Sequence, residues 1–173
     1  MSQGVLTDLT DGILTIQFNR PDAMNALHLE AFLALEAALA NLDPEVRAII
    51  VKGNERAFCS GADVSLMSPG QGSLGMEKIT QLMQTYRNVE VPVIAAVSGP
   101  AAGIGCSLAL MADYVLMSEK SYLMLAFTRI GLMPDGGATA LVAASAGRHR
   151  ALRMALTAEK LPATSAFEWG LAS

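Results

Sequence analysis

The sequence predicts an α/β fold in which helices cover a largely parallel sheet. Short segments that are apolar, or that alternate between apolar and polar residues, occur at 12–20, 47–53, 91–99 and 113–119 and are typical of strands. Longer segments with apolar residues at helical spacing come between them. Strands that alternate with helices along a chain favour a parallel sheet, because each connection crosses from one end of the sheet to the other.

The first half of the chain begins with a strand and a helix. In GILTIQFNRP, Leu14, Ile16 and Phe18 alternate with polar residues until Pro21 stops the strand. A helix is expected over 27–42, where leucines recur at helical spacing and the dipeptide Asp-Pro follows. RAIIVKG then predicts a short buried strand, and NERAFCSGADVSLM predicts a loop that turns into a helix.

The second half continues the alternation. SPGQGSLG is rich in Gly and Ser and is expected to be a mobile loop, and a helix follows it over 76–86. VPVIAAVSG, DYVLMSE and YLML are expected to be strands, and 103–112 a helix. After GLMPDGG the chain is expected to be helical almost to its end, with 138–146 and 148–157 as the main segments. No repeat or linker divides the chain, so residues 1–173 are expected to form one domain.

Composition excludes several classes of partner. The chain has 173 residues, of which 52% are hydrophobic, and a net charge of −4 without any block of Lys or Arg, which disfavours nucleic acid and anionic membranes. No apolar run approaches the roughly 20 residues that a membrane span needs. The start MSQGVLTDLTDG lacks the basic region and apolar core of a signal peptide, so a reducing cytoplasm is expected, with Cys59 and Cys106 as free thiols.

Two loops lead from a strand into a helix through glycine. The first leaves its strand at Gly53 and turns at Gly61, and the second turns at Gly99, Gly103 and Gly105. Such turns expose backbone N–H groups, and the first N–H groups of a helix have no partner within the helix. We therefore expect that the two loops could converge on one oxygen atom.

Elimination narrows the kinds of anion that these loops could bind. Neither the phosphate-binding pattern G-x-x-x-x-G-K-[ST] nor the dinucleotide pattern G-x-G-x-x-G is present, and no cation is near. A small, transient charge such as an enolate oxygen fits, because paired backbone donors suffice to stabilise it. The alternative is that the glycines only let helices pack closely against strands.

Four motifs carry a resemblance to a known family. They are FNRPDAMNAL, AFCSGADV, VPVIAAVSGPAAGIGCSLALMADY and AFTRIGLMPDGGAT. In their order and spacing the chain resembles the crotonase, or enoyl-CoA hydratase/isomerase, superfamily from about residue 10 to Ser173. The resemblance implies a crotonase-like (ClpP/crotonase) superhelix of repeated ββα units, homotrimers or dimers of trimers, and acyl-CoA thioester substrates. Family members continue into a C-terminal helical portion, which is expected to be missing or truncated here.

The resemblance also assigns roles to residues of the two glycine loops. It implies that the N–H groups of Ala62 and Ile104 form an oxyanion hole for the thioester carbonyl. Positions that match those lining the coenzyme A arm are Met24, Ala26, Ser60, Asp63 and Val64. Simple packing is the alternative for these five, and Asp63 could equally cap a helix. Because coenzyme A belongs to the substrate, no separate cofactor and no metal are expected.

The acid/base residues depart from the hydratase pattern. Hydratases of the family carry glutamates at the positions of Ser107 and Phe127, and both are absent. Asp135 in GLMPDGG matches the position where enoyl-CoA isomerases, and some relatives acting on aromatic-acid CoA esters, place a single carboxylate. Asp135 is therefore the candidate base, although local sequence alone favours a turn or helix cap before Gly137. Ser107 could donate a hydrogen bond in the active site or bond its own helix.

The resulting hypothesis is an enoyl-CoA isomerase. Asp135 would take the C2 proton of a 3-enoyl-CoA and return it at C4, while the oxyanion hole holds the dienolate. A dry pocket must raise the basicity of the carboxylate, and Leu132, Met133 and Phe127 are expected to supply it. The alternatives are isomerisation of a ring-derived epoxide of the phenylacetate type, hydration by Asp135 alone, and a non-catalytic acyl-CoA-binding relative.

Overall fold

The computed structural model describes residues 4–66 and 75–173. Its main sheet has five strands in the order β1-β2-β3-β4-β6. Their bounds are β1 (Val5–Thr10), β2 (Ile13–Phe18), β3 (Ala48–Lys52), β4 (Val93–Val97) and β6 (Tyr114–Met117). β2, β3, β4 and β6 pair with one another in parallel, which confirms the predicted largely parallel sheet. The predicted mobile loop SPGQGSLG lies, except for Gly75, outside the described residues.

β1 is an antiparallel edge strand that the sequence analysis did not predict. It pairs with β2 from Val5 opposite Phe18 to Thr10 opposite Ile13, across the two-residue turn Asp11-Gly12. All its residues except Val5 are exposed, so the strand shows no buried face in its pattern. An Asp-Gly dipeptide between two strands is the signal that could have identified this hairpin.

A smaller second sheet links successive units of the chain. Its strands are β5 (Pro100–Ala102), β7 (Tyr122–Met124) and β8 (Leu161–Pro162). Isolated bridges extend it, because Leu27 pairs with Ala62 and Cys59 pairs with Ala101. Each unit thus contributes one strand to the main sheet and one extended segment to the second sheet before its helix, as expected for repeated ββα units.

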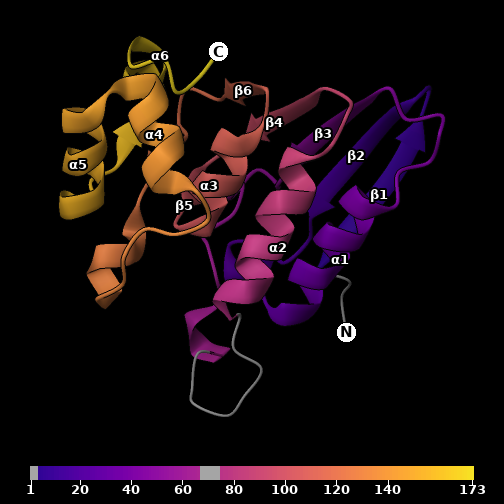
Figure 1. Cartoon of the computed structure of the whole chain (residues 1–173), viewed down its shortest axis with the longest axis horizontal. Coiled ribbons are helices and arrows are strands. Elements are labelled where there is room, and N and C mark those ends of the chain that lie inside the picture. Colours follow the sequence, from indigo (N-terminus) through magenta and orange to yellow (C-terminus); the bar gives the residue numbers. More distant parts are fainter. Residues whose placement is uncertain (1–3, 67–74) are drawn as a thin grey trace.

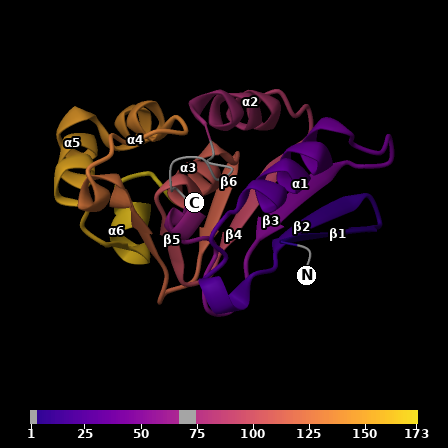
Figure 2. The ribbon, with the colours of Figure 1, turned by 90° about the horizontal axis from the view of Figure 1, so that it is seen from below.

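The helices lie in two groups. The first three units end in α1 (Leu29–Ala40), α2 (Met76–Arg87) and α3 (Ile104–Met111). Figure 2 shows α1 and α2 along one face of the main sheet. The second group, α4 (Ala138–Ala146), α5 (Arg148–Thr157) and α6 (Ala163–Glu168), gathers at the end of the molecule away from β1 (Figure 1). None of the helices within the described ranges is long and apolar enough to span a bilayer.

The described part of the chain also has three short 3-10 helices: η1 (Pro21–Ala23), η2 (Val64–Leu66) and η3 (Ala126–Ile130). η2 corrects one prediction, because the helix expected within NERAFCSGADVSLM is only this single turn in the part that is described. The segment before it is anchored in the core. Phe58 is fully buried and packs edge-to-face on Phe18, with ring centroids 5.4 Å apart. This contact fixes the first glycine loop to β2.

Candidate active site

The two glycine loops lie against each other. Cys59 N–H donates to the Pro100 carbonyl at 3.1 Å, and Ala102 N–H donates to the Cys59 carbonyl at 2.9 Å. A Cβ atom added at Gly105 would lie 2.3 Å from the carbonyl oxygen of Cys59, so only glycine lets α3 approach the first loop this closely. The loops therefore meet at the N-terminal end of α3.

Ala62 and Ile104 line one cavity of about 290 Å³ at this junction. Ile104 is the first residue of α3, where the helix offers its amide no acceptor. On the other loop, the Leu27 N–H donates to the Gly61 carbonyl and the Asp63 N–H donates to the Leu27 carbonyl. These two hydrogen bonds do not use the N–H of Ala62, which lies between Gly61 and Asp63. Among the described residues neither amide has a hydrogen-bond acceptor. Two free backbone donors thus border the same cavity.

Asp135 borders the same cavity from the loop between η3 and α4. Its carboxylate is half-buried, and burial raises its pKa above the ordinary value of 3.8. The Oδ1 atom is buried and has no hydrogen-bond partner among the described residues. α4 is capped by Gly137 without any side-chain hydrogen bond, so Asp135 does not act as the helix cap that local sequence favours. Its side chain is therefore free to act on a bound molecule.

The surroundings of Asp135 are mostly apolar. Phe127 is buried and lines the cavity together with Ile130 and Leu132. Met133 does not line it and is 79% exposed, which corrects the expectation that this side chain helps to dry the pocket. The loop turns outward at Met133 before it returns at Asp135.

The two positions of the hydratase glutamates hold no acid. Ser107 is fully buried, and its hydroxyl donates to the backbone carbonyl of Asp135 at 3.1 Å. Phe127 fills the other position. Asp135 is thus the only carboxylate among the described residues that line the cavity.

Asp135 also borders a second cavity of about 400 Å³. α2, Met111 of α3 and the loop that contains Pro134 and Gly137 enclose it. Its apolar walls include Met76, Ile79 and Met83. Of the described residues, Asp135 alone lines both cavities.

The residues assigned to the coenzyme A arm fall into two groups. Ser60 and Val64 line the first cavity, whereas Met24, Ala26 and Asp63 do not. The Ser60 N–H donates to the Met24 carbonyl at 3.0 Å, which holds the two segments side by side. The structure thus brings all five segments to one edge of the cavity, although only two of the side chains face it.

The carboxylate of Asp63 is held by contacts with neighbouring residues of the protein. Its carboxylate lies 2.9 Å from the Arg20 guanidinium, which also donates to the Ala26 carbonyl. Asp63 also accepts the N–H and hydroxyl of Ser65. The hydrogen bond from the Ser65 hydroxyl, helped by Arg20, lowers the pKa of Asp63 below 3.8. The contacts made by Asp63 are those of a cap for η2 and an anchor between two loops.

The two thiols lie beneath the glycine loops as free cysteines. Cys59 and Cys106 are fully buried, and burial raises the pKa of each to about 12. A thiol in this state is a poor nucleophile, because the thiolate is the reactive form.

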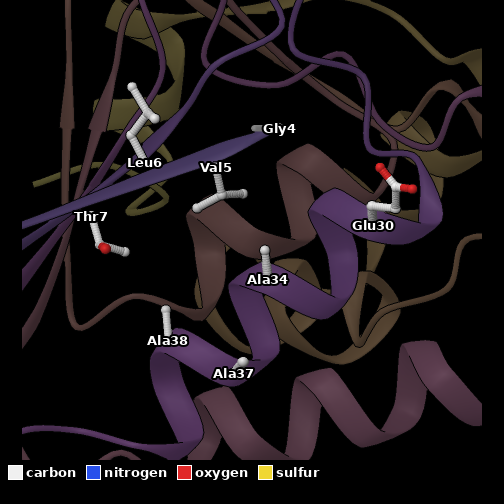
Figure 3. A pocket seen from close by; sticks show the side chains of 8 residues that line it. All are labelled: Gly4, Val5, Leu6, Thr7, Glu30, Ala34, Ala37 and Ala38. Carbon is white, nitrogen blue, oxygen red and sulfur yellow. The ribbon is translucent and has the colours of Figure 1, made fainter. Parts of the chain in front are cut away.

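A larger cavity of about 590 Å³ lies elsewhere, between β1 and α1. Figure 3 shows Ala34 and Ala38 of α1 facing the strand, with Glu30 at one end. Glu30 is its only ionisable lining residue among those described, and no residue of the glycine loops reaches it. Nor does any group of three or more His, Cys, Asp or Glu within residues 4–66 and 75–173 form a metal-binding cluster. The junction of the glycine loops is therefore the candidate for chemistry.

Comparisons with known proteins agree on one family. A family model described as Enoyl-CoA hydratase/isomerase matches residues 8–173. A probable enoyl-CoA hydratase from Rhodobacter capsulatus is 42% identical over 172 residues, which cover 95% of this chain and 65% of that protein. The 1,2-epoxyphenylacetyl-CoA isomerase from Escherichia coli is 33% identical over 180 residues, covering 99% of this chain and 69% of that protein.

Solved structures give the same result. A crystal structure of an enoyl-CoA hydratase from Mycobacterium avium subsp. paratuberculosis has a TM-score of 0.89 and 44% identity, and the match covers 98% of this chain and 67% of that one. One of a putative enoyl-CoA hydratase from Streptomyces coelicolor has a TM-score of 0.91 and 34% identity, covering 98% and 66% of the two chains. The present chain spans about two thirds of the length of these relatives.

Proposed function

The chain belongs to the enoyl-CoA hydratase/isomerase, or crotonase, family, and we propose that it acts as an enoyl-CoA isomerase. One observation carries the proposal: a single carboxylate, that of Asp135, shares a cavity with the free amides of Ala62 and Ile104. The relatives named as hydratases and as an isomerase support the family without choosing between these activities.

The two amides would form the oxyanion hole. The thioester carbonyl of an acyl-CoA binds between the N–H groups of Ala62 and Ile104, and the negative charge of the enolate develops on its oxygen. Donors fixed before the reaction need no reorganisation, and removing one such donor costs about 2.7–4 kcal/mol of transition-state stabilisation. The N-terminal end of α3 adds the favourable end of the helix dipole.

Asp135 would move the proton. Its carboxylate takes a proton from C2 of a 3-enoyl-CoA, and the C–H electron pair delocalises through the C3–C4 double bond and the carbonyl as a dienolate. The protonated Asp135 then returns the proton to C4, which leaves a C2–C3 double bond and an ionised carboxylate. Burial raises the pKa of Asp135, which strengthens it as a base.

The two cavities suggest how the substrate lies. Because one carboxylate serves both C2 and C4, it must lie beside C3, in the middle of the segment C2–C4. The acyl carbons after C4 must therefore extend past the carboxylate. The second cavity begins at Asp135 and has methionine-rich, adaptable walls. We place the acyl tail there and the coenzyme A arm on the side of Ser60 and Val64, so that coenzyme A enters as part of the substrate.

A related reaction is the second candidate. The similarity to the 1,2-epoxyphenylacetyl-CoA isomerase supports a ring-derived CoA ester as substrate, with the same carboxylate and oxyanion hole. Hydration is less well supported, because it needs one group to activate water and one to supply the α proton, while the described lining residues include one carboxylate.

Assembly and location remain predictions. A homotrimer or a dimer of trimers is consistent with large apolar side chains that the single chain leaves exposed, including Ile130, Leu156 and Phe167. Light scattering of the purified protein measures the mass of the assembly, and a monomer would contradict this proposal. The cytoplasmic location is tested by fractionating cells that carry a tagged protein.

The function is tested by product analysis. The purified protein is given a 3-enoyl-CoA, a 2-enoyl-CoA and a 1,2-epoxyphenylacetyl-CoA in separate reactions, and products are separated by chromatography. We expect conversion of the 3-enoyl to the 2-enoyl thioester, with little 3-hydroxyacyl-CoA. Fast hydration of the 2-enoyl thioester would assign the protein as a hydratase, turnover of the epoxide alone would assign the ring reaction, and binding without turnover would make it a non-catalytic relative.

A further inference from the structure

We propose that Ser107 is a positioning residue, which fixes Asp135 relative to the amide of Ile104. This inference rests on the proposed function, since it concerns the same base. The hydroxyl of Ser107 donates to the backbone carbonyl of Asp135 at 3.1 Å, across 28 positions of sequence. Ser107 is fully buried, so water does not compete for this hydrogen bond.

The direction of this bond distinguishes it from ordinary helix chemistry. A serine inside a helix commonly donates to a carbonyl one turn earlier in its own helix. Here the Gly103 carbonyl receives the backbone N–H of Ser107, at 3.3 Å, while the side chain reaches out to the loop of Asp135. The hydroxyl therefore joins two separate elements rather than one helix to itself.

Asp135 depends on this bond because no described residue anchors its carboxylate. The Oδ1 atom is buried and has no partner within residues 4–66 and 75–173, so the position of the acid follows from the backbone that carries it. That backbone is held at its carbonyl by two donors, the Ser107 hydroxyl and the Ala138 N–H, each at 3.1 Å. Removing the hydroxyl leaves the Ala138 N–H as the remaining donor to this carbonyl among the described residues.

The same turn of α3 carries the proposed oxyanion donor. Ile104 and Ser107 are three residues apart and lie on one face of the helix. The loop packs directly on this face at Gly136, where an added Cβ would lie 3.1 Å from Cβ of Ser107 and 3.3 Å from Cγ1 of Ile104. Gly136 has a φ of +58°, which favours glycine. One helical turn thus sets the distance between the base and the amide that stabilises the enolate.

The expected consequence is a loss of rate rather than of binding. Ser107→Ala removes the hydroxyl without adding bulk, so the loop keeps its packing but loses its fixed position. Because a misplacement of about 1 Å can cost about 10²-fold in rate, we expect kcat to fall between about tenfold and 10²-fold. KM is expected to change less than about threefold, because no group that faces the coenzyme A arm is altered.

A matched control separates positioning from stability. Ser121 is also buried, and its hydroxyl donates to the Ser118 carbonyl, away from both cavities. Ser121→Ala removes a comparable hydrogen bond and is expected to lower the melting temperature about as much as Ser107→Ala, with kcat unchanged. An unchanged kcat in Ser107→Ala, or an equal loss of kcat in both variants, would overturn the inference.

A double-mutant cycle tests whether Ser107 acts through Asp135. Rates are measured for wild type, Ser107→Ala, Asp135→Asn and the double variant, as exchange of the C2 hydrogens of a saturated acyl-CoA with D₂O at high enzyme concentration. We expect Ser107→Ala to slow exchange in the wild-type background and to have less than about a twofold effect in the Asp135→Asn background. Fully additive effects would contradict a role through Asp135.

Exchange also separates the two proposals. It requires only that the base take the C2 proton and the enolate be held, so it does not depend on transfer to C4. Exchange without isomerisation would contradict the proposed function and still decide the role of Ser107. A wild-type protein that neither exchanges nor isomerises would contradict both.

Discussion

Asp63 and Asp135 lie in loops beside the same junction but in opposite environments. Asp63 accepts hydrogen bonds from Arg20 and Ser65, and these contacts lower its pKa. Asp135 has a buried oxygen that no described residue contacts through a hydrogen bond, and burial raises its pKa. Asp135 borders two cavities, whereas Asp63 lines neither.

The difference shows how environment assigns roles to two identical side chains. A carboxylate whose acceptor sites are filled is held in its charged form and serves as an anchor. A carboxylate that is partly desolvated and unpaired is a stronger base and can serve in proton transfer. The predictions below test this contrast from its largest expected effect to its smallest.

Replacing each acid by its amide gives the largest contrast. Asp135→Asn removes the base and is expected to lower kcat for isomerisation by about 10²–10⁴-fold. Asp63→Asn keeps the shape of the anchor and is expected to change kcat less than about tenfold, because its oxygens touch no substrate group in this proposal. Steady-state kinetics with a 3-enoyl-CoA measure both, and equal losses would remove the distinction between base and anchor.

The oxyanion donor can be removed without removing the helix. Proline is tolerated at the first position of a helix, where Ile104 lies, and it lacks the N–H. Ile104→Pro is expected to lower kcat by about 10²–10³-fold. Ile104→Ala loses the same buried side chain but keeps the amide, so it serves as the control. Similar kcat values for the two variants would show that the amide plays no part.

The second cavity predicts a dependence on acyl length. Thr80 lies exposed on α2 at its wall, so Thr80→Trp narrows the space without disturbing the core. Each buried methylene contributes about 0.8 kcal/mol, so wild-type kcat/KM is expected to rise about fourfold per carbon while the cavity fills. The variant should lose this rise for long chains and keep the rate for short ones. A parallel loss at every length would place the tail elsewhere.

The smallest effect is on stability, and its sign differs between the two acids. The lowered pKa of Asp63 contributes stability that is present above pH 3.8 and is lost as the pH falls through the folded-state pKa. We expect Asp63→Asn to destabilise the protein at pH 7 by about 0.2–1 kcal/mol, since the ion pair is partly solvated.

Asp135 has the opposite linkage. Its raised pKa favours the folded state fully below pH 3.8, and this contribution is lost as the pH rises through the folded-state pKa. Asp135→Asn should therefore stabilise the protein at pH 7, and the gain over wild type should shrink on acidification. Thermal unfolding between pH 3.5 and pH 7 measures both variants. A common sign would contradict the assignment of environments.

The fold could be predicted for those elements whose buried residues leave a regular pattern of apolar positions in the sequence. The parallel strands β2, β3, β4 and β6 were predicted because their apolar residues alternate or form short continuous runs. β1 was missed because it is exposed and its hairpin turn was the only signal. The segment after Gly61, for which a helix was expected, is described only to Leu66, where it forms one 3-10 turn with Asp63 accepting the Ser65 N–H.

The site was predictable only in part. The resemblance to the family gave Ala62, Ile104 and Asp135 as candidates, and the structure brings all three to one cavity. The partner of Ser107 could not be read from sequence, because the contact joins α3 to a loop 28 positions away. The same holds for the ion pair of Arg20 and Asp63 and for the second cavity, which depend on tertiary packing.

Label transfer tests most directly whether one carboxylate shuttles the proton. A 3-enoyl-CoA carrying deuterium at C2 is converted in ordinary water, and NMR locates the deuterium in the product. If half-buried Asp135 carries the atom between the two carbons, a measurable fraction of the label will appear at C4. Rapid isomerisation that leaves C4 with hydrogen from solvent only would contradict direct carriage of the atom from C2 to C4 by Asp135.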